Sequence, residues 1–249
     1  MLNLETAIRQ AKALGAAPII AEIKRVIPKL GGVYRPDVRE ASLLARLYEE
    51  GGAVAISVVT ESRHFGGKPA EDLPAVLEAV PLPVLIKDFI VDNSRIDYYA
   101  HLIRSVKEAD LNRVTLLLIS HLASEKTGEL MKHIHHYGMT VLLETRKVKD
   151  LEYPGHNAGC LRLVGINNKV IDVMETDDNR VGLTPEMIRD YRRLVGEALI
   201  ISESAHLRPL DVCKSLDAGA DAVLAGTAFM QAECPRSAVS QFVNCREVV

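Results

Sequence analysis

Eight short aliphatic runs recur along the chain, and none shows the alternation of polar and apolar residues that is typical of half-exposed strands. Continuous runs of this kind indicate parallel strands that are covered on both faces. We therefore predict eight buried strands. They lie at Pro18–Ile23, Ala53–Val59, Pro83–Lys87, Val114–Ser120, Met139–Glu144, Arg162–Ile166, Ala198–Ser202 and Ala222–Gly226.

Segments with helical spacing and charged faces separate these runs. Gly51, Gly138 and Gly219 stand where helices end, and Thr184 before Pro185 has the order of an N-cap and a first helical residue. The expected helices lie at Arg39–Gly52, Glu71–Val80, Ser94–Ala109, Ser124–Gly138, Thr184–Glu197 and Leu207–Ala220.

One strand and one helix in roughly every 30 residues is the spacing of a (β/α)8 TIM barrel. An open, doubly wound sheet is the alternative, but it usually needs fewer strands, and no GxGxxG sequence follows the first run. No linker or shift in composition divides the chain. We predict an α/β fold with a single TIM-barrel domain over residues 1–249, in which a short helix within residues 1–17 precedes a barrel at 18–249.

Composition narrows the classes of function. The 249 residues are 48% hydrophobic with a net charge of -3, and Lys and Arg are scattered, which disfavours nucleic acid or an anionic membrane as partner. No apolar run approaches the roughly 20 residues that span a bilayer, and no secretory pattern opens the chain, so we expect a cytoplasmic protein. The cysteines lack CxxC spacing, which favours free thiols over disulfides or zinc. They are Cys160, Cys213, Cys234 and Cys245.

Polar residues close most of the aliphatic runs, and active sites of such barrels lie at these strand ends. Glu22 and Lys24 are two residues apart, so they point to the same side of the first strand. If that side is the interior, they join one polar pocket. The strand-end residues are Glu22, Lys24, Ser57, Thr60, Lys87, Glu144, Asn167, Ser202, Glu203, Ser204, Gly226 and Thr227.

Two readings of these charges stay open. One is a structural ion-pair network at the barrel mouth; the other is acid/base chemistry, since converging lysines and carboxylates couple their titrations. The last two strand ends carry hydroxyls and small residues where backbone N–H groups bind phosphate well, although small residues also serve close packing. A small phosphorylated molecule is therefore the expected partner, and no metal-ligand motif accompanies the set.

Seven motifs in order and spacing resemble the indole-3-glycerol phosphate synthase family from Pro18 onward. They read IIAEIKR, AISVVTESRHFGG, PVLIKDFIVD, VLLE, GINN, ISES and VLAGTAFM. The resemblance implies a cofactor-independent enzyme of tryptophan biosynthesis. Its reaction closes the indole ring of 1-(2-carboxyphenylamino)-1-deoxyribulose 5-phosphate with loss of carbon dioxide and water, which makes it a carboxy-lyase.

The same resemblance implies roles for individual residues. Lys87 would be the general acid toward the ribulose carbonyl, Glu144 the acid/base of the dehydration, and Lys24, with Glu22 beside it, the partner of the anthranilate carboxylate. Asn167 and Glu203 would bind ribulose hydroxyls and orient the lysines. Phosphate-cradling and ring-packing positions match the following residues: Ser204, Gly226, Thr227, Phe65 and Phe89.

The chain departs from the family at the edges of the substrate. Ile27 replaces a serine near the phosphate, Ala205 replaces a glycine, and Lys169 replaces an arginine that helps to hold the anthranilate carboxylate. The segment ahead of the first strand is also shorter, so we expect a smaller lid over the site. The departures leave open a divergent synthase, a paralogue acting on a related phosphorylated or carboxylated ligand, and a binding protein on the same fold, as monomer or homodimer.

Three further features stand outside this set. His133, His135 and His136 do not share one helical face, which favours a solvated face over a metal site. The acidic stretch Met174–Gly182, with Glu175, Asp177 and Asp178, lacks calcium-loop spacing and is expected to be a loop near the site. His206 lies next to Ala205 at the predicted mouth of the barrel.

Overall fold

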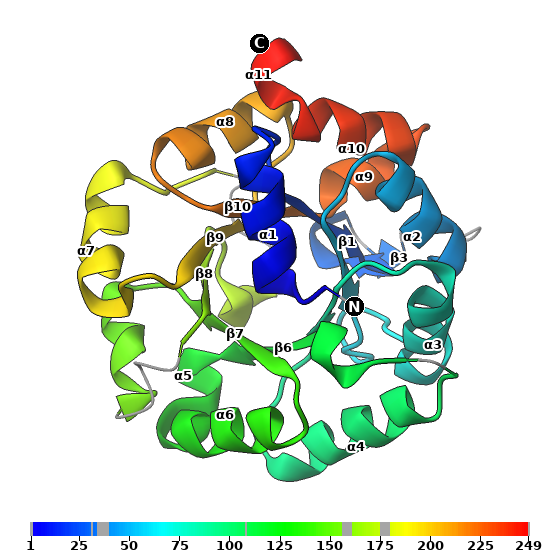
Figure 1. Ribbon diagram of the computed structural model, residues 1–249, viewed down its shortest axis with the longest axis vertical. Coiled ribbons are helices and arrows are strands. Elements are labelled where there is room, and N and C mark those ends of the chain that lie inside the picture. Colours follow the sequence, from blue (N-terminus) through cyan, green and yellow to red (C-terminus); the bar gives the residue numbers. More distant parts are fainter. Residues whose placement is uncertain are drawn as a thin grey trace.

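The aliphatic runs form the strands of a closed barrel. The computed structural model describes residues 2–30, 32–33, 40–107, 109–155, 161–174 and 180–248. The barrel strands there are β1 (Ile19–Ile23), β4 (Ala55–Val59), β5 (Val84–Lys87), β6 (Val114–Ile119), β7 (Thr140–Thr145), β8 (Leu163–Asn167), β9 (Leu199–Glu203) and β10 (Ala222–Ala225). Each pairs in parallel with the strand before and after it, and β1 pairs with β10 to close the ring. The predicted TIM barrel is confirmed (Figure 1).

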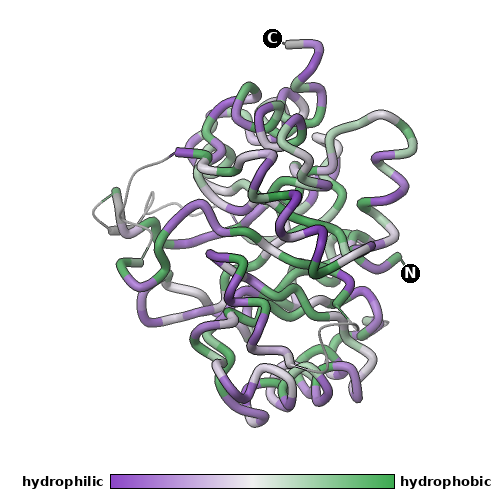
Figure 2. The backbone as a smooth tube through the Cα atoms, turned by 90° about the vertical axis from the view of Figure 1, so that its left-hand side faces the viewer, coloured by the Kyte–Doolittle hydropathy of each residue, from purple (hydrophilic) through white to green (hydrophobic). Residues whose placement is uncertain are grey.

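Helices surround the strands at the predicted positions. They are α2 (Ala41–Glu50), α3 (Pro69–Ala79), α4 (Asn93–Arg104), α6 (Thr127–His136), α7 (Pro185–Val195) and α8 (Pro209–Asp217). Thr184 caps α7 as predicted, since its hydroxyl accepts the N–H of Met187 at 3.3 Å. Figure 2 shows hydrophobic segments running through the middle of the molecule and hydrophilic stretches recurring along its periphery.

The sequence pattern did not predict the remaining elements, most of which are short. They are the hairpin β2 (Val26–Ile27) and β3 (Gly32–Val33), the helices α5 (Ser120–Ala123), α9 (Thr227–Gln231), α10 (Pro235–Val243) and α11 (Cys245–Val248), and the 3-10 turns η1 (Pro28–Leu30), η2 (Leu111–Arg113), η3 (Ser124–Lys126), η4 (Val148–Glu152) and η6 (Ile171–Val173). Cys160, Glu175, Asp177 and Asp178 lie outside the described residues.

Two hydrophobic layers follow from the period of two along each strand. In β1, Ile20 belongs to the cluster that fills the barrel, whereas Ile19, Ala21 and Ile23 belong to the cluster between strands and helices. Glu22 has the parity of Ile20. The first charged residue of the strand therefore points into the barrel, which meets the condition for one polar pocket.

The amino-terminal helix α1 (Leu4–Ala13) is at the opposite end of the barrel from the expected lid. Leu4 and Ile8 are fully buried in the barrel-interior cluster. Lys12 pairs with Asp221, which directly precedes β10, and Arg9 donates to the carbonyl of Glu197 at 3.1 Å, just ahead of β9. The expectation of a smaller lid over the site is thus wrong for this helix, which crosses the amino end of the barrel (Figure 1).

No helix in the described part of the chain combines the length and the apolar character needed to cross a membrane.

Asp221 links α1, α7 and β9 at the amino end of the barrel, and its contacts lead to a first prediction. It accepts hydrogen bonds from Lys12, from Arg192 and from the backbone N–H of Ile200 at 2.8 Å. Although burial raises its pKa, these bonds outweigh burial and leave the pKa lowered. We expect Asp221→Asn to lower the free energy of unfolding at neutral pH by about 1–3 kcal/mol, measured by urea denaturation, because the buried N–H of Ile200 and two partly exposed cations lose a charged acceptor.

Asp217→Asn is the matched control. That carboxylate also pairs with an arginine, Arg246, but both side chains are more than half exposed. Exposed pairs contribute about 0–1 kcal/mol. Equal losses in the two variants would contradict the assignment of Asp221 as a buried anchor.

Candidate active site

The end of β1 delivers a charged pair to the barrel mouth. Glu22 and Lys24 are 3% and 6% exposed, and Lys24 Nζ lies 3.0 Å from Glu22 Oε1. Burial at these positions makes mutual pairing necessary, because an isolated buried charge is very costly. The sequence prediction that both side chains share one side and meet in one pocket agrees with this geometry.

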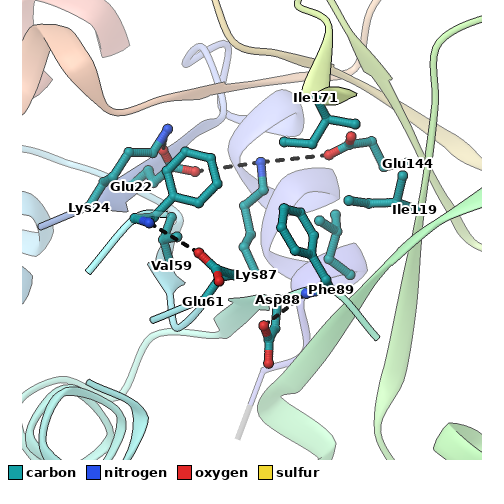
Figure 3. Close-up of a pocket in the computed structure, with 12 residues that line it drawn as sticks. Glu22, Lys24, Val59, Glu61, Lys87, Asp88, Phe89, Ile119, Glu144 and Ile171 are labelled. Carbon is teal, nitrogen blue, oxygen red and sulfur yellow. Dashed lines mark hydrogen bonds and ion pairs between the residues drawn. The ribbon is translucent and has the colours of Figure 1, made fainter. Parts of the chain in front are cut away.

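Lys87, the last residue of β5, stands at the centre of the site. Its Nζ lies 3.0 Å from Glu203 Oε2, 3.6 Å from Glu22 Oε2 and 3.8 Å from Glu144 Oε2. These three carboxylates come from β9, β1 and β7. Figure 3 shows the ammonium group of Lys87 between Glu22 and Glu144. One amine thus faces three possible proton partners.

Glu203 is the most deeply buried member of this cluster. Burial raises its pKa to about 8, an effect that Lys87 opposes and that the charges of Glu144 and Glu22 reinforce. Lys24 and Lys87 bring two positive charges to three carboxyl groups, so a proton held on Glu203 near neutral pH balances the set. A carboxyl group poised in this range is suited to proton transfer.

Gly165 in β8 makes room for Glu203. A Cβ atom at this position would lie 1.8 Å from Glu203 Oε1. The glycine therefore permits the carboxyl group to lie inside the barrel between β8 and Lys87. Gly165, the first residue of the GINN motif, is therefore required for a steric reason.

Two asparagines at the end of β8 orient neighbouring groups. Asn167 Nδ2 donates to Glu144 Oε1 at 3.1 Å, which fixes that carboxylate beside Lys87. Asn168 was not singled out from the sequence, yet its Nδ2 donates to Ser202 Oγ at 3.0 Å and to the carbonyl of Glu203 at 2.9 Å. It ties the ends of β8 and β9 together.

An apolar pocket opens on one side of this cluster. Phe65 is 4% exposed, and its ring meets that of Phe89 edge to face at 6.4 Å between centroids. Lys24 Nζ lies 5.2 Å from the centroid of Phe65, within the range of a cation–π contact. Aliphatic side chains complete the apolar wall: Val59, Leu117, Ile119 and Ile171. These side chains give the pocket an apolar wall beside the charged groups of the cluster.

A second pocket opens on the other side, and Glu22 and Lys24 line both. It also contains the predicted phosphate-side residues Ser204, Gly226 and Thr227. A Cβ atom at Gly226 would lie 2.9 Å from Glu22, so the glycine is needed for this close approach. The predicted phosphate-side residues are therefore brought together.

The three departures have distinct structural outcomes. Ile27 lies in β2 and packs in the hydrophobic layer outside the strands, where it is 6% exposed. Lys169 lines the second pocket and is not among the residues of the apolar pocket. Ala205 adopts a left-handed backbone with φ of 66°, and Ser204 before it has φ of 64°. The backbone keeps a conformation that favours glycine although the residue is alanine.

The histidines divide between the core and the surface. His206 is 2% exposed, and its Nε2 contacts Ser215 Oγ at 2.8 Å and Ser202 Oγ at 3.3 Å. Burial lowers its pKa to about 4. His133 instead lies 2.7 Å from Asp97 on the outer helices. Within the described ranges, no group of three or more His, Cys, Asp or Glu side chains is placed to hold a metal ion.

Sequence reasoning missed two carboxylates that line the apolar pocket. Glu61 follows β4 and accepts backbone N–H groups of the loop that carries Phe65. Asp88 follows Lys87 and accepts the N–H of Phe89 at 2.8 Å and the hydroxyl of Tyr99 at 2.6 Å. The motifs TESRHF and LIKDF contain both, but only the folded loops show what they bind.

Comparison with known proteins agrees with the motifs. A model of the indole-3-glycerol phosphate synthase family matches residues 1–242. The chain belongs to the indole-3-glycerol phosphate synthase family. Relatives described as indole-3-glycerol phosphate synthase include one from Methanopyrus kandleri, 36% identical over 95% of this chain and 87% of the relative, and one from Pyrococcus furiosus, 34% identical over 98% of each.

A solved structure supports the fold alone. The structure described as "Native KDPGal structure" aligns with a TM-score of 0.62 over 93% of this chain and 95% of its own, at 14% sequence identity. Membership of the indole-3-glycerol phosphate synthase family therefore rests on sequence. The barrel shared with this structure carries no information on chemistry.

Replacing Gly165 tests the space behind Glu203. An interior strand glycine normally costs about 0.5–1 kcal/mol relative to alanine, so Gly165→Ala would ordinarily stabilise the protein. Here we expect the opposite sign, with loss of stability in thermal melts, because the new methyl group must displace the Glu203 carboxyl group from Lys87. Gly182→Ala, where no atom lies within 4 Å of the added Cβ, is the control and should be close to wild type.

Replacing Ala205 tests the backbone strain in the second pocket. We expect Ala205→Gly to raise the free energy of unfolding by about 0.5–1.5 kcal/mol, because glycine adopts a left-handed backbone without the Cβ penalty. Ala218→Gly, at a right-handed helix end with φ of -69°, should instead be destabilising. Chemical denaturation measures both, and a destabilised Ala205→Gly protein would contradict the assignment of strain.

Proposed function

We propose that the protein is an indole-3-glycerol phosphate synthase, a carboxy-lyase acting on 1-(2-carboxyphenylamino)-1-deoxyribulose 5-phosphate. The observation that carries this proposal is the enclosure of Lys87 by Glu22, Glu144 and Glu203 between an apolar pocket and a second pocket lined by Ser204. The family membership supports the same activity.

Binding places the two ends of the substrate in different pockets. The carboxyphenyl ring enters between Phe65 and Phe89, and the phosphate lies near Ser204 and Gly226. Lys24 lines both pockets, so it supplies positive charge near the point where the two halves of the substrate meet. The ring carbon that bears the carboxylate is then held close to the ribulose carbonyl, which lowers the entropic cost of ring closure.

Lys87 begins the chemistry as a general acid. Its ammonium group gives a proton to the ribulose carbonyl oxygen while the ring carbon attacks the carbonyl carbon and forms the new carbon–carbon bond. The carboxylate leaves as carbon dioxide, and its bonding electron pair restores the aromatic ring. Lysine suits this step because its proton can move, whereas an arginine hardly loses its proton.

Glu144 acts in the second half of the reaction. The new hydroxyl group leaves as water with a second proton from Lys87, which Glu203 has protonated again, and Glu144 accepts a proton from the neighbouring carbon, which completes the indole. Asn167 holds Glu144 through its 3.1 Å hydrogen bond. Glu203, whose pKa is raised to about 8, lies 3.0 Å from Lys87 and is placed to return a proton to it.

Lys87→Met tests the proposed general acid. We expect turnover to fall by roughly two orders of magnitude or more, because general acid catalysis is removed. Indole fluorescence after addition of the carboxyphenylamino-deoxyribulose phosphate measures turnover, and titration with anthranilate measures ligand affinity. Affinity should change little.

Lys68→Met serves as the control, since Lys68 is an exposed lysine paired with Glu71 and should keep wild-type turnover. Unchanged turnover in Lys87→Met would reject the mechanism. A wild-type protein that binds the ligand without any turnover would instead favour the paralogue or the binding protein.

A further inference from the structure

Glu61 organises the loop after β4 around its own carboxylate. Its Oε1 accepts the N–H of Arg63 at 2.8 Å, and its Oε2 accepts those of His64 at 2.7 Å and Phe65 at 3.1 Å. Its backbone carbonyl accepts the N–H of Gly67 at 2.8 Å. The residue is 8% exposed. One side chain therefore satisfies three consecutive backbone donors of the loop.

The loop ends in the ring that faces the charged cluster. The carbonyl of Phe65 accepts the N–H of Val26 at 3.0 Å, which ties the loop to the segment after Lys24. A Cβ atom at Gly66 would lie 2.7 Å from Val26, and one at Gly67 would lie 2.5 Å from the backbone of Thr60. The loop is packed closely on both sides, so Phe65 has little freedom once the turn has formed.

The three backbone N–H donors of this loop favour a carboxylate as their acceptor. Both oxygens of Glu61 accept hydrogen bonds from the backbone, and these bonds are charge-assisted. A glutamine in the same place offers one acceptor oxygen and an amide group that donates, so at least one N–H would face another donor. An alanine would leave all three without this acceptor. Glu61 is itself one of the residues that line the apolar pocket, but because the turn binds both of its oxygens, it acts on the pocket through the turn and the ring that the turn holds.

We propose that Glu61 is a positioning residue that sets the affinity of the apolar pocket for an aromatic carboxylate by fixing the ring of Phe65. The inference rests on the proposed function only in taking this pocket as the place of the substrate ring. Since Glu61 does not line the second pocket, it leaves affinity for phosphate unchanged.

A double-mutant cycle between Glu61→Gln and Phe65→Leu tests this coupling. We expect Glu61→Gln to raise KM and the dissociation constant for anthranilate about tenfold each, a change of about 1.4 kcal/mol, with a smaller effect on kcat. Binding of inorganic phosphate should stay at the wild-type value. The double variant should bind anthranilate no more weakly than Phe65→Leu alone, because residues that act as one unit are not additive.

Asp110→Asn is the matched control. Asp110 also accepts a backbone N–H, that of Asn112 at 2.9 Å, but it lies ahead of β6 at the amino end of the barrel. It should leave both affinities unchanged. If Glu61→Gln does not fold cooperatively, Glu61→Asp, which keeps the charge and both oxygens, replaces it in the cycle.

Fully additive losses, or an equal loss of phosphate affinity, would overturn the proposal, because either result means that Glu61 acts on the whole fold. Anthranilate binding does not require turnover. A wild-type protein without synthase activity that still shows the non-additive binding pattern would therefore refute the proposed function and support the role of Glu61.

Discussion

The contact between Lys87 and Glu203 is the constraint on which the mouth of the barrel depends. A lysine at the end of a buried strand needs partners, and a fully buried carboxyl group needs either a cation or a proton. At 3.0 Å each group supplies what the other lacks. Glu22 and Glu144 complete the surroundings of the amine, and the charge of Lys24 together with a proton on Glu203 offsets the excess negative charge. The site is a single electrostatic unit built from separate strands.

The barrel makes this unit possible by dividing its interior into layers. Apolar side chains such as Ile20 and Leu142 fill the barrel below the charged strand ends, and α1 covers the amino end with Leu4 and Ile8. Charged side chains of the same parity, such as Glu22, Lys87 and Glu203, lie at the carboxyl ends of their strands. The apolar layers supply the hydrophobic stabilisation, which offsets the free-energy cost of burying the charged layer. Along one strand, the residues that stabilise the fold are therefore different from those that form the site.

Much of this arrangement could be predicted from the sequence because it depends on local periodicity. The strand period placed Glu22 and Lys24 on one side, and strand-end positions brought Lys87, Glu144 and Glu203 together. Features that depend on tertiary contacts could not be predicted. The pattern of α1 shows an apolar face but not which end of the barrel it covers. Glu61 reads as an ordinary loop carboxylate until its three backbone donors are located.

The positions where the chain departs from the family also could not be interpreted from the sequence alone. Ile27 reads as a lost hydroxyl group beside the phosphate, yet it is a packed residue of a short hairpin. Ala205 reads as a simple replacement of glycine by alanine. The backbone adds a separate effect, because its φ of 66° places an alanine in a conformation that glycine adopts more readily. Neither distinction is visible without coordinates.

Gly165 and Glu203 have a consequence for how such a site can change over time. The carboxyl group of Glu203 lies where any side chain at Gly165 would begin, at 1.8 Å from the missing Cβ atom. A larger residue at Gly165 is tolerable only after Glu203 has been shortened, and shortening Glu203 first deprives Lys87 of its nearest partner. The two positions are sterically coupled, so the effect of a substitution at either one depends on the residue at the other.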